Sequence, residues 1–168
     1  GNTMKHTLLI ITALMLVVGC SSDKETSSSQ APVDRTDAKS TAGAILRAYK
    51  AKDLRTLATL SHRFNHDMFV EMADSGKSHT RYNSTWSGWR WEGAQTWNGQ
   101  IGEARYKQSR SRISASVKFG ETFEDSGSIL VVKLEWEDGK WCFEDIHSPS
   151  PDMFLEWGLE KPKIPKDL

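Results

Sequence analysis

Four histidines after residue 60 and two aspartates carry the side chains that could transfer protons or bind a metal: His62, His66, His79, His147, Asp67 and Asp145. His62 and His66 are four residues apart, the spacing of a two-histidine zinc site on one helix. However, a helix is expected to begin at Asn65, between them, and the glutamate of that motif is missing. None of the six has a recognisable base and orienting partner at a defined spacing. We therefore predict solvated loop histidines, no catalytic residue, no metal and no other cofactor.

Tryptophans are concentrated between residues 80 and 101. If this segment forms short strands, Trp89 and Trp91 point to the same side, with Arg90 opposite. Exposed, the two rings could stack on a sugar or form the centre of a protein interface. Buried, they would be core, and this interpretation is favoured because a small curved sheet needs large side chains to close it.

A second candidate binding surface comprises Arg110 and Arg112, which alternate with apolar residues at the start of an expected strand over residues 110–119. Together with Ser114, Ser116 and Lys118 they could form a basic docking face. The solvated outer face of an antiparallel sheet gives the same pattern, and it is the favoured interpretation.

Composition limits the class of protein. The chain has 168 residues, and its 22 acidic residues balance 22 Lys and Arg. Such a balance excludes a general nucleic-acid binder. The length suits one ordinary domain with a real core.

Helical spacing of apolar residues appears in three segments between residues 40 and 76. Ser40 or Thr41 is the expected N-cap of the first helix, and Asp53 that of the second. Gly76 is the expected stop of the third.

The rest of the chain predicts mainly strands. After the short strands over 80–101, longer ones are expected over 110–119, 128–137 and 141–146, and then a helical turn or two over 152–157. Residues 129–132 are apolar on both faces, as in a central strand, and Asp138-Gly139 is a hairpin signal. Helices followed by consecutive antiparallel strands predict an α+β fold, with N-terminal helices packed on a curved, cone-like antiparallel β-sheet and a short C-terminal helical segment.

The N-terminus carries an export signal. Residues 1–3 precede Met4 and are taken as a cloning remnant or an upstream start. Lys5 and His6 form a short positive region, and residues 7–18 are nearly all apolar and uncharged. Gly19 then precedes Cys20. This pattern is typical of a cleaved signal peptide over residues 4–19, and it is too short to span a bilayer.

The ending Val17-Val18-Gly19-Cys20 resembles the lipobox of bacterial lipoproteins. The resemblance implies that the Cys20 sulfur carries a diacylglyceryl group, that the chain is cut before Cys20 and that the new amine is acylated. Ser21 in the next position implies the outer membrane of a Gram-negative cell. An acylated Cys20 cannot form a disulfide, so Cys142, the other cysteine, is expected to be a buried, unreactive thiol.

Composition also divides the mature chain. Residues 20–39 are Ser-rich and poor in apolar side chains, which predicts a flexible tether. A single α+β domain is expected over residues 40–160, and a loose tail over 161–168.

Two motifs resemble the nuclear transport factor 2-like superfamily, which includes the SnoaL-like proteins and has a cystatin-like α+β arrangement. Tyr49-Lys50-Ala51-Lys52 followed by Asp53-Leu54 resembles its helical start, and Asp138-Gly139-Lys140-Trp141 its closing hairpin. The resemblance covers about residues 40–147. It implies a cavity on the concave side of the sheet, in which isomerase-like members place an Asp, His or Tyr.

Together these features predict a membrane-anchored, non-enzymatic binding or accessory lipoprotein on the periplasmic face of the outer membrane. One alternative is an inhibitor or immunity-type lipoprotein. The other is a small isomerase- or hydrolase-type enzyme with its site in the sheet cavity. The expected partners are the membrane, through the lipid anchor, and a periplasmic protein or small ligand. The oligomeric state is open, a dimer included.

Overall fold

The computed structural model describes residues 32–120 and 128–164. The description below concerns the compact unit that begins at Pro32. The predicted signal peptide, Cys20 and the first part of the predicted tether therefore lie outside the described residues. So do the last four residues of the predicted tail.

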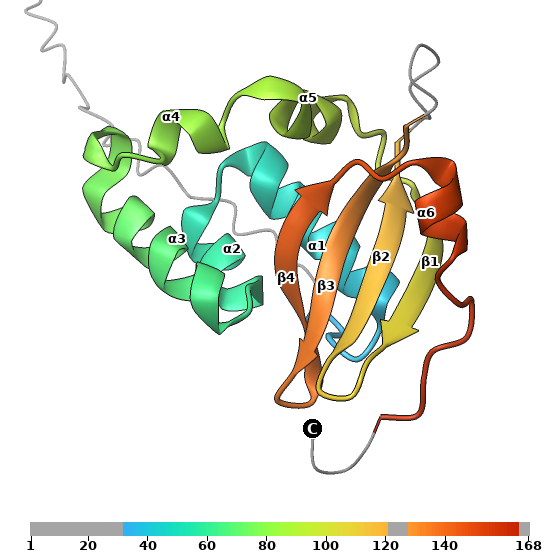
Figure 1. Cartoon of the computed structure of the whole chain (residues 1–168). Helices are drawn as coiled ribbons and strands as arrows, with labels where there is room; N and C mark the ends of the chain where they lie inside the picture. Colours follow the sequence, from blue (N-terminus) through green and yellow to red (C-terminus); the bar gives the residue numbers. More distant parts are fainter. Residues whose placement is uncertain (1–31, 121–127, 165–168) are drawn as a thin grey trace, which may run out of the picture. The chain divides into compact units, whose positions relative to one another are not determined.

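Helices come first along the described chain, and an antiparallel sheet follows (Figure 1). The helices are α1 (Ala38–Ala51), α2 (Leu54–Leu60), α3 (Arg63–Ser75), the 3-10 turn η1 (Gly76–Ser78), α4 (Tyr82–Thr85) and α5 (Gly88–Thr96). The strands are β1 (Ile101–Gln108), β2 (Ile113–Phe119), β3 (Leu130–Glu137) and β4 (Lys140–His147), followed by α6 (Pro151–Leu155). The predicted α+β class is confirmed, with a four-stranded sheet that is not closed.

Helix α1 lies against the sheet and contacts all four strands. Its apolar side, including the fully buried Ile45 and Leu46, forms the centre of the hydrophobic core. The helix begins earlier than expected. Asp37 is its N-cap and accepts a 2.6 Å hydrogen bond from the backbone N–H of Ser40. The prediction of Ser40 or Thr41 as the cap was therefore wrong.

Helices α2 and α3 follow with short connections. Asp53 caps α2 as predicted, accepting from the backbone N–H of Thr56 at 3.0 Å. The N-cap of α3 is His62, whose ring Nδ1 accepts from the backbone N–H of Phe64 at 3.0 Å. Gly76 ends α3 at a positive φ, as predicted. His62 is thus part of the fold rather than a solvated loop histidine.

The segment expected to form short strands over residues 80–101 folds mainly as α4 and α5. The prediction missed the helical spacing of the buried residues Gly93, Ala94 and Trp97 in and directly after α5. Gly93 has a packing role here, because a Cβ at this position would clash with the side chain of Leu130 on β3. The glycine therefore brings α5 close to the sheet.

The sheet is a meander of order β1-β2-β3-β4. The predicted hairpin is present, with Asp138 and Gly139 both at positive φ, as a tight β3–β4 turn requires. The β3–β4 register shifts between Lys133 and Leu134, which pair with Asp145 and Phe143, so Glu144 is an extra residue in β4. Such a bulge redirects the side chains beside it.

Both edge strands form hydrogen bonds to segments outside the sheet. The carbonyl oxygens of Phe143, Glu144 and Ile146 on β4 accept from the His62 N–H (3.1 Å), Asn65 Nδ2 (2.6 Å) and Arg90 Nε (2.9 Å). On β1, Tyr106 exchanges backbone hydrogen bonds with Gly158. Helices and the C-terminal segment thus satisfy backbone groups that an open edge would expose.

Ordered structure begins before residue 40. The guanidinium of Arg35 donates to the carbonyl oxygens of Thr59 (2.8 Å), Leu60 (3.2 Å) and Trp141 (3.0 Å), which ties the N-terminal segment to α2 and β4. Lys161 Nζ donates to the Thr36 carbonyl at 2.8 Å. The predicted start of the domain at residue 40 was thus too late. Over the ranges described, no helix has the length and apolar character to cross a membrane.

Candidate functional site

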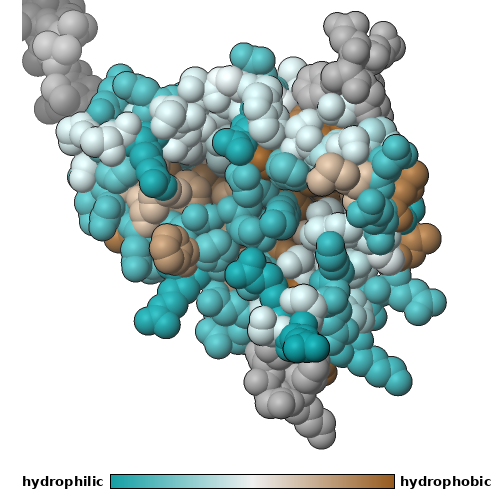
Figure 2. All heavy atoms as spheres, viewed as in Figure 1, coloured by the Kyte–Doolittle hydropathy of each residue, from teal (hydrophilic) through white to brown (hydrophobic). Residues whose placement is uncertain are grey.

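A groove of about 530 Å³ lies between α3, the α4–α5 segment and the edge strand β4. We call it the α3–β4 groove. Apolar surface shows between α3 and β4 among hydrophilic residues in Figure 2. Its lining comes from five elements and the loops beside them: Tyr49, His62, Phe64, Asn65, Met68, Phe69, Arg81, Ser84, Thr85, Arg90, Phe143, Glu144, Asp145 and Ile146.

Apolar side chains make up one part of this lining. Phe69 and Phe143 stack with ring centroids 6.2 Å apart and tie α3 to β4. Met68 is partly buried beside them. Phe64, in the first turn of α3, is 87% exposed. An aromatic side chain this exposed offers contact area to a ligand or partner.

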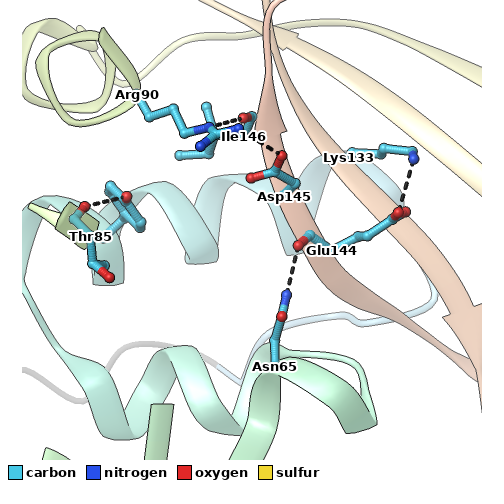
Figure 3. A network of polar contacts seen from close by, with 8 residues as sticks. Asn65, Thr85, Arg90, Lys133, Glu144, Asp145 and Ile146 are labelled. Carbon is cyan, nitrogen blue, oxygen red and sulfur yellow. Dashed lines mark hydrogen bonds and ion pairs between the residues drawn. The ribbon is translucent and has the colours of Figure 1, made fainter. Parts of the chain in front are cut away.

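Arg90 and Asp145 form the polar wall next to α5 (Figure 3). Arg90 donates through Nε to the Ile146 carbonyl at 2.9 Å, and its terminal nitrogen lies 3.3 Å from Asp145 Oδ2. The central carbon of this guanidinium also lies over the Trp89 ring, 4.9 Å from the ring centroid. Burial raises the pKa of Asp145, and the nearby Arg90 charge opposes this shift.

Tyr49 reaches the groove from the end of α1. Its hydroxyl donates a 2.6 Å hydrogen bond to the carbonyl oxygen of Thr85. Burial raises the pKa of Tyr49 to about 12. The phenol is therefore neutral at physiological pH and its proton is already engaged, so it cannot act as a general base there.

Asn65 and Glu144 close the groove on the side of α3. Asn65 Nδ2 donates to the backbone carbonyl of Glu144, and the Glu144 carboxylate turns toward Lys133, with Oε1 2.9 Å from Nζ (Figure 3). The other carboxylate oxygen, Oε2, is buried and has no protein hydrogen-bond partner among the described residues. The negative charge of Glu144 is thus paired with Lys133 rather than with a group of the groove.

Arg81, between η1 and α4, is the other guanidinium of the groove. Its terminal nitrogen lies 3.2 Å from the thioether sulfur of Met68. Within the described ranges, no carboxylate forms an ion pair with Arg81. A thioether is only a weak acceptor, so this cation retains most of its capacity for hydrogen bonds.

The two tryptophans proposed as binding residues do not share one environment, because both lie on α5 instead of on a strand. Trp91 is partly buried against Tyr49 and Trp86, and Lys52 Nζ lies 4.7 Å above its ring. Trp89 is 40% exposed. Residues two apart in the sequence share a face in a strand but point to nearly opposite sides of a helix. The predicted common orientation was wrong for this reason.

The two arginines proposed as a basic face lie in the β1–β2 turn, because β2 begins only at Ile113. Arg112 pairs with Glu135 on β3 at 2.9 Å, and Arg110 is exposed. Ser114 and Ser116, expected on the same face, are buried. The alternative of a continuous basic docking face is therefore not formed. The favoured interpretation, a solvated outer face of the sheet, was also wrong at Ser114 and Ser116.

The remaining candidates are dispersed. His66 lies 3.0 Å from Asp67 in an exposed pair, and His79 lies 3.8 Å from Glu71. His147 is outside the α3–β4 groove. No group of three or more His, Cys, Asp or Glu side chains in the described part of the chain is placed to hold a metal ion.

Cys142 is buried, as predicted. Burial raises the pKa of its thiol, although a guanidinium nitrogen of Arg35 lies 3.1 Å from the sulfur. The thiol form is therefore favoured, which agrees with the low reactivity expected of it.

The sequence interpretation missed Tyr49, Asn65, Arg81 and Arg90 as groove residues. Tyr49 belongs to the motif Tyr49-Lys50-Ala51-Lys52, but no short motif contains all four residues, since they come from four separate segments. The one usable signal was the aromatic cluster around Trp86, which marks α4 and α5 as packed elements. Comparisons of the chain with models of known families, with curated proteins and with solved structures found no match.

Proposed function

We propose that this chain is a lipid-anchored binding protein of the bacterial cell envelope that holds a small ligand in the α3–β4 groove. Its anchor would be Cys20, at the end of a lipobox-like signal peptide, and Ser21 favours the periplasmic face of the outer membrane. We further propose a nuclear transport factor 2-like domain. The order of helices and antiparallel strands and the Asp138-Gly139 hairpin support this assignment.

The groove itself is the observation that carries the binding function. Its volume of about 530 Å³ falls within the usual range of small-molecule sites, roughly 300–1,000 Å³. Apolar side chains from α3 and β4 line it, with a few polar groups at its edges. This combination favours recognition of a small molecule with both apolar and polar parts.

The state of the polar groups favours binding over catalysis. Tyr49, Asn65 and Arg90 each donate to a backbone carbonyl and so hold the walls together. A general base must reach the substrate proton and have a partner that orients it. Asp145 is already paired with Arg90. These residues thus stabilise the walls of the groove, as a binding site requires. A proton-transfer site would need some of the same groups to be free for the substrate.

A groove-filling variant tests the proposal. The wild-type protein and Met68→Trp are purified from envelope fractions, extracted with organic solvent and compared by mass spectrometry. Met153→Trp, at an exposed methionine outside the groove, is the matched control. A small molecule released by the wild type and the control, but not by Met68→Trp, supports the proposal. Equal extracts from all three proteins contradict it.

One observation favours a second candidate, a small isomerase-type enzyme with Asp145 as its base. Burial in a partly apolar groove raises the pKa of this carboxyl. Enzymes use burial in this way to bring the pKa of a proton-transfer group near the working pH. The extracted molecule decides between the two. If the wild type converts this molecule and Asp145→Asn does not, the protein is an enzyme rather than a binding protein. If the molecule is recovered unchanged from the wild type, binding is supported.

A further inference from the structure

We infer that the ligand of the α3–β4 groove is an anion with an apolar body, held at its charged end by Arg81. This inference rests on the proposed function and adds the chemical class of the ligand. It is based on the balance of charges at the groove and on the position of its exposed apolar surface.

Four charged side chains line the groove: Arg81, Arg90, Glu144 and Asp145. Three of them are neutralised within the protein. Arg90 pairs with Asp145 at 3.3 Å, and Glu144 pairs with Lys133 at 2.9 Å on β3. Arg81 remains, and within the described residues its guanidinium donates only to the Met68 sulfur. The groove therefore presents one uncompensated positive charge.

A guanidinium offers five N–H donors, and its strongest partners are carboxylates, phosphates and sulfonates. A cationic ligand would be repelled at this position. A neutral ligand would gain little from Arg81. Charge complementarity thus selects an anion, although solvent screens part of the attraction because Arg81 is exposed.

The apolar part of the ligand has a defined place. Phe64 and Met68 lie four residues apart on α3 and therefore on one face of the helix. Met68 contacts the Arg81 guanidinium, and Phe64 is almost fully exposed. A molecule whose anionic end binds Arg81 can lay an apolar body along Met68 toward Phe64. This would remove from water the aromatic side chain that is most exposed in the described structure.

Two fluorescent probes with the same ring system distinguish the contribution of the negative charge to affinity from that of the apolar rings. Anilinonaphthalene sulfonate is an anion, and phenylnaphthylamine is its uncharged counterpart. The protein for titration is residues 21–168, which contain the whole compact unit from Pro32 with its own core. A cooperative thermal transition, recorded first for each variant, shows that it is folded.

The variants are Arg81→Gln, Arg81→Lys and Met68→Trp, with Arg110→Gln as a control at an exposed turn arginine. The sulfonate should bind more tightly than the neutral probe, and Arg81→Gln should weaken it about tenfold, the effect of one charge-assisted hydrogen bond. Arg81→Lys should retain most of the affinity. Met68→Trp should weaken the binding of both probes, and Arg110→Gln should change the binding of neither.

Each other outcome overturns the inference in a distinguishable way. If both probes bind equally and respond to Met68→Trp but not to Arg81→Gln, the anion class is wrong while the ligand groove stands. If neither probe binds, or if Met68→Trp does not change the affinity of either probe, the groove is not a small-ligand site. The proposed function is then contradicted as well.

Discussion

The hydroxyl of Tyr49 lies 2.6 Å from the carbonyl oxygen of Thr85 and donates its proton to it. This hydrogen bond joins α1, the helix packed on the sheet, to α4, which borders the α3–β4 groove. The Tyr49 ring also contacts Trp86 and Trp91, at centroid distances of 5.2 and 5.9 Å. One residue of the core thus positions the wall of the groove formed by α4 and α5.

Tyr49→Phe keeps the ring but removes this bond. It should lower the free energy of unfolding by about 1–2 kcal/mol, because the Thr85 carbonyl loses its partner in a partly buried site. Urea titration followed by tryptophan fluorescence measures the change. Tyr82→Phe is the control, since the Tyr82 hydroxyl has no hydrogen bond within the described residues. An equal loss in both variants would show that the Tyr49 bond has no special role.

Trp89 and Trp91 should differ in their contribution to stability. Trp91→Ala should lower the free energy of unfolding by about 2–4 kcal/mol, because it removes a ring packed on Tyr49 and Trp86. Trp89→Ala should cost less than about 1 kcal/mol, the value of an exposed cation–π contact with Arg90. Thermal melts of the two variants test this. Equal losses would place both rings in one environment, against the helical assignment of this segment.

Features of this chain that depend on a few adjacent residues were predicted correctly from the sequence. Asp53 caps α2 with its side chain, Gly76 ends α3 with its backbone N–H, and Asp138-Gly139 forms its turn from two adjacent residues. Residues 129–132, which are apolar on both faces, lie at the start of β3. As predicted for them, β3 is an inner strand of the sheet. In each case the signal lies in a few adjacent residues of the sequence.

Signals that depend on distant partners failed. In residues 80–101, glycine and tryptophan match strand and turn preferences, and only contact with α1 and β3 makes helices the better packing. Strand β1 was not predicted because it is mostly polar, and pairing with β2 and Gly158 holds it in place. The groove was not predicted either. Arg81 meets Met68 and Arg90 meets Asp145 only in the folded chain.

The half-buried carboxyl of Asp145 predicts a pH dependence of stability. Its pKa is raised in the folded state, mainly by burial, so the folded state holds this proton more tightly than the unfolded state does. Its contribution to stability is therefore fully present below the ordinary value of 3.8 and is lost as the pH rises through the raised value. Asp145→Asn should remove this part of the pH dependence. Urea titrations between about pH 4 and 7 test this, and identical pH profiles for the two proteins would contradict it.

Anchoring should depend on Cys20. Each buried CH₂ of an acyl chain contributes about 0.8 kcal/mol, and stable attachment needs more than one chain. Cys20→Ser should therefore leave the protein uncleaved or release it to the soluble fraction. Membrane fractionation and the mass of the N-terminal peptide are the measurements, with Cys142→Ser as the control because Cys142 is buried in the domain. Unchanged fractionation together with an N-terminal peptide free of acyl mass would end the lipoprotein proposal.

Amide hydrogen exchange tests most directly whether the α3–β4 groove is the ligand site. Protein purified from the envelope is compared with the same protein after its small molecules have been removed by unfolding, dialysis and refolding. The account predicts that loss of the ligand speeds exchange in three of the segments that line the groove, residues 62–69, 81–90 and 143–146, and leaves the β1–β2 turn unchanged. Identical exchange in the two samples, or a change confined to segments outside the groove, would contradict it.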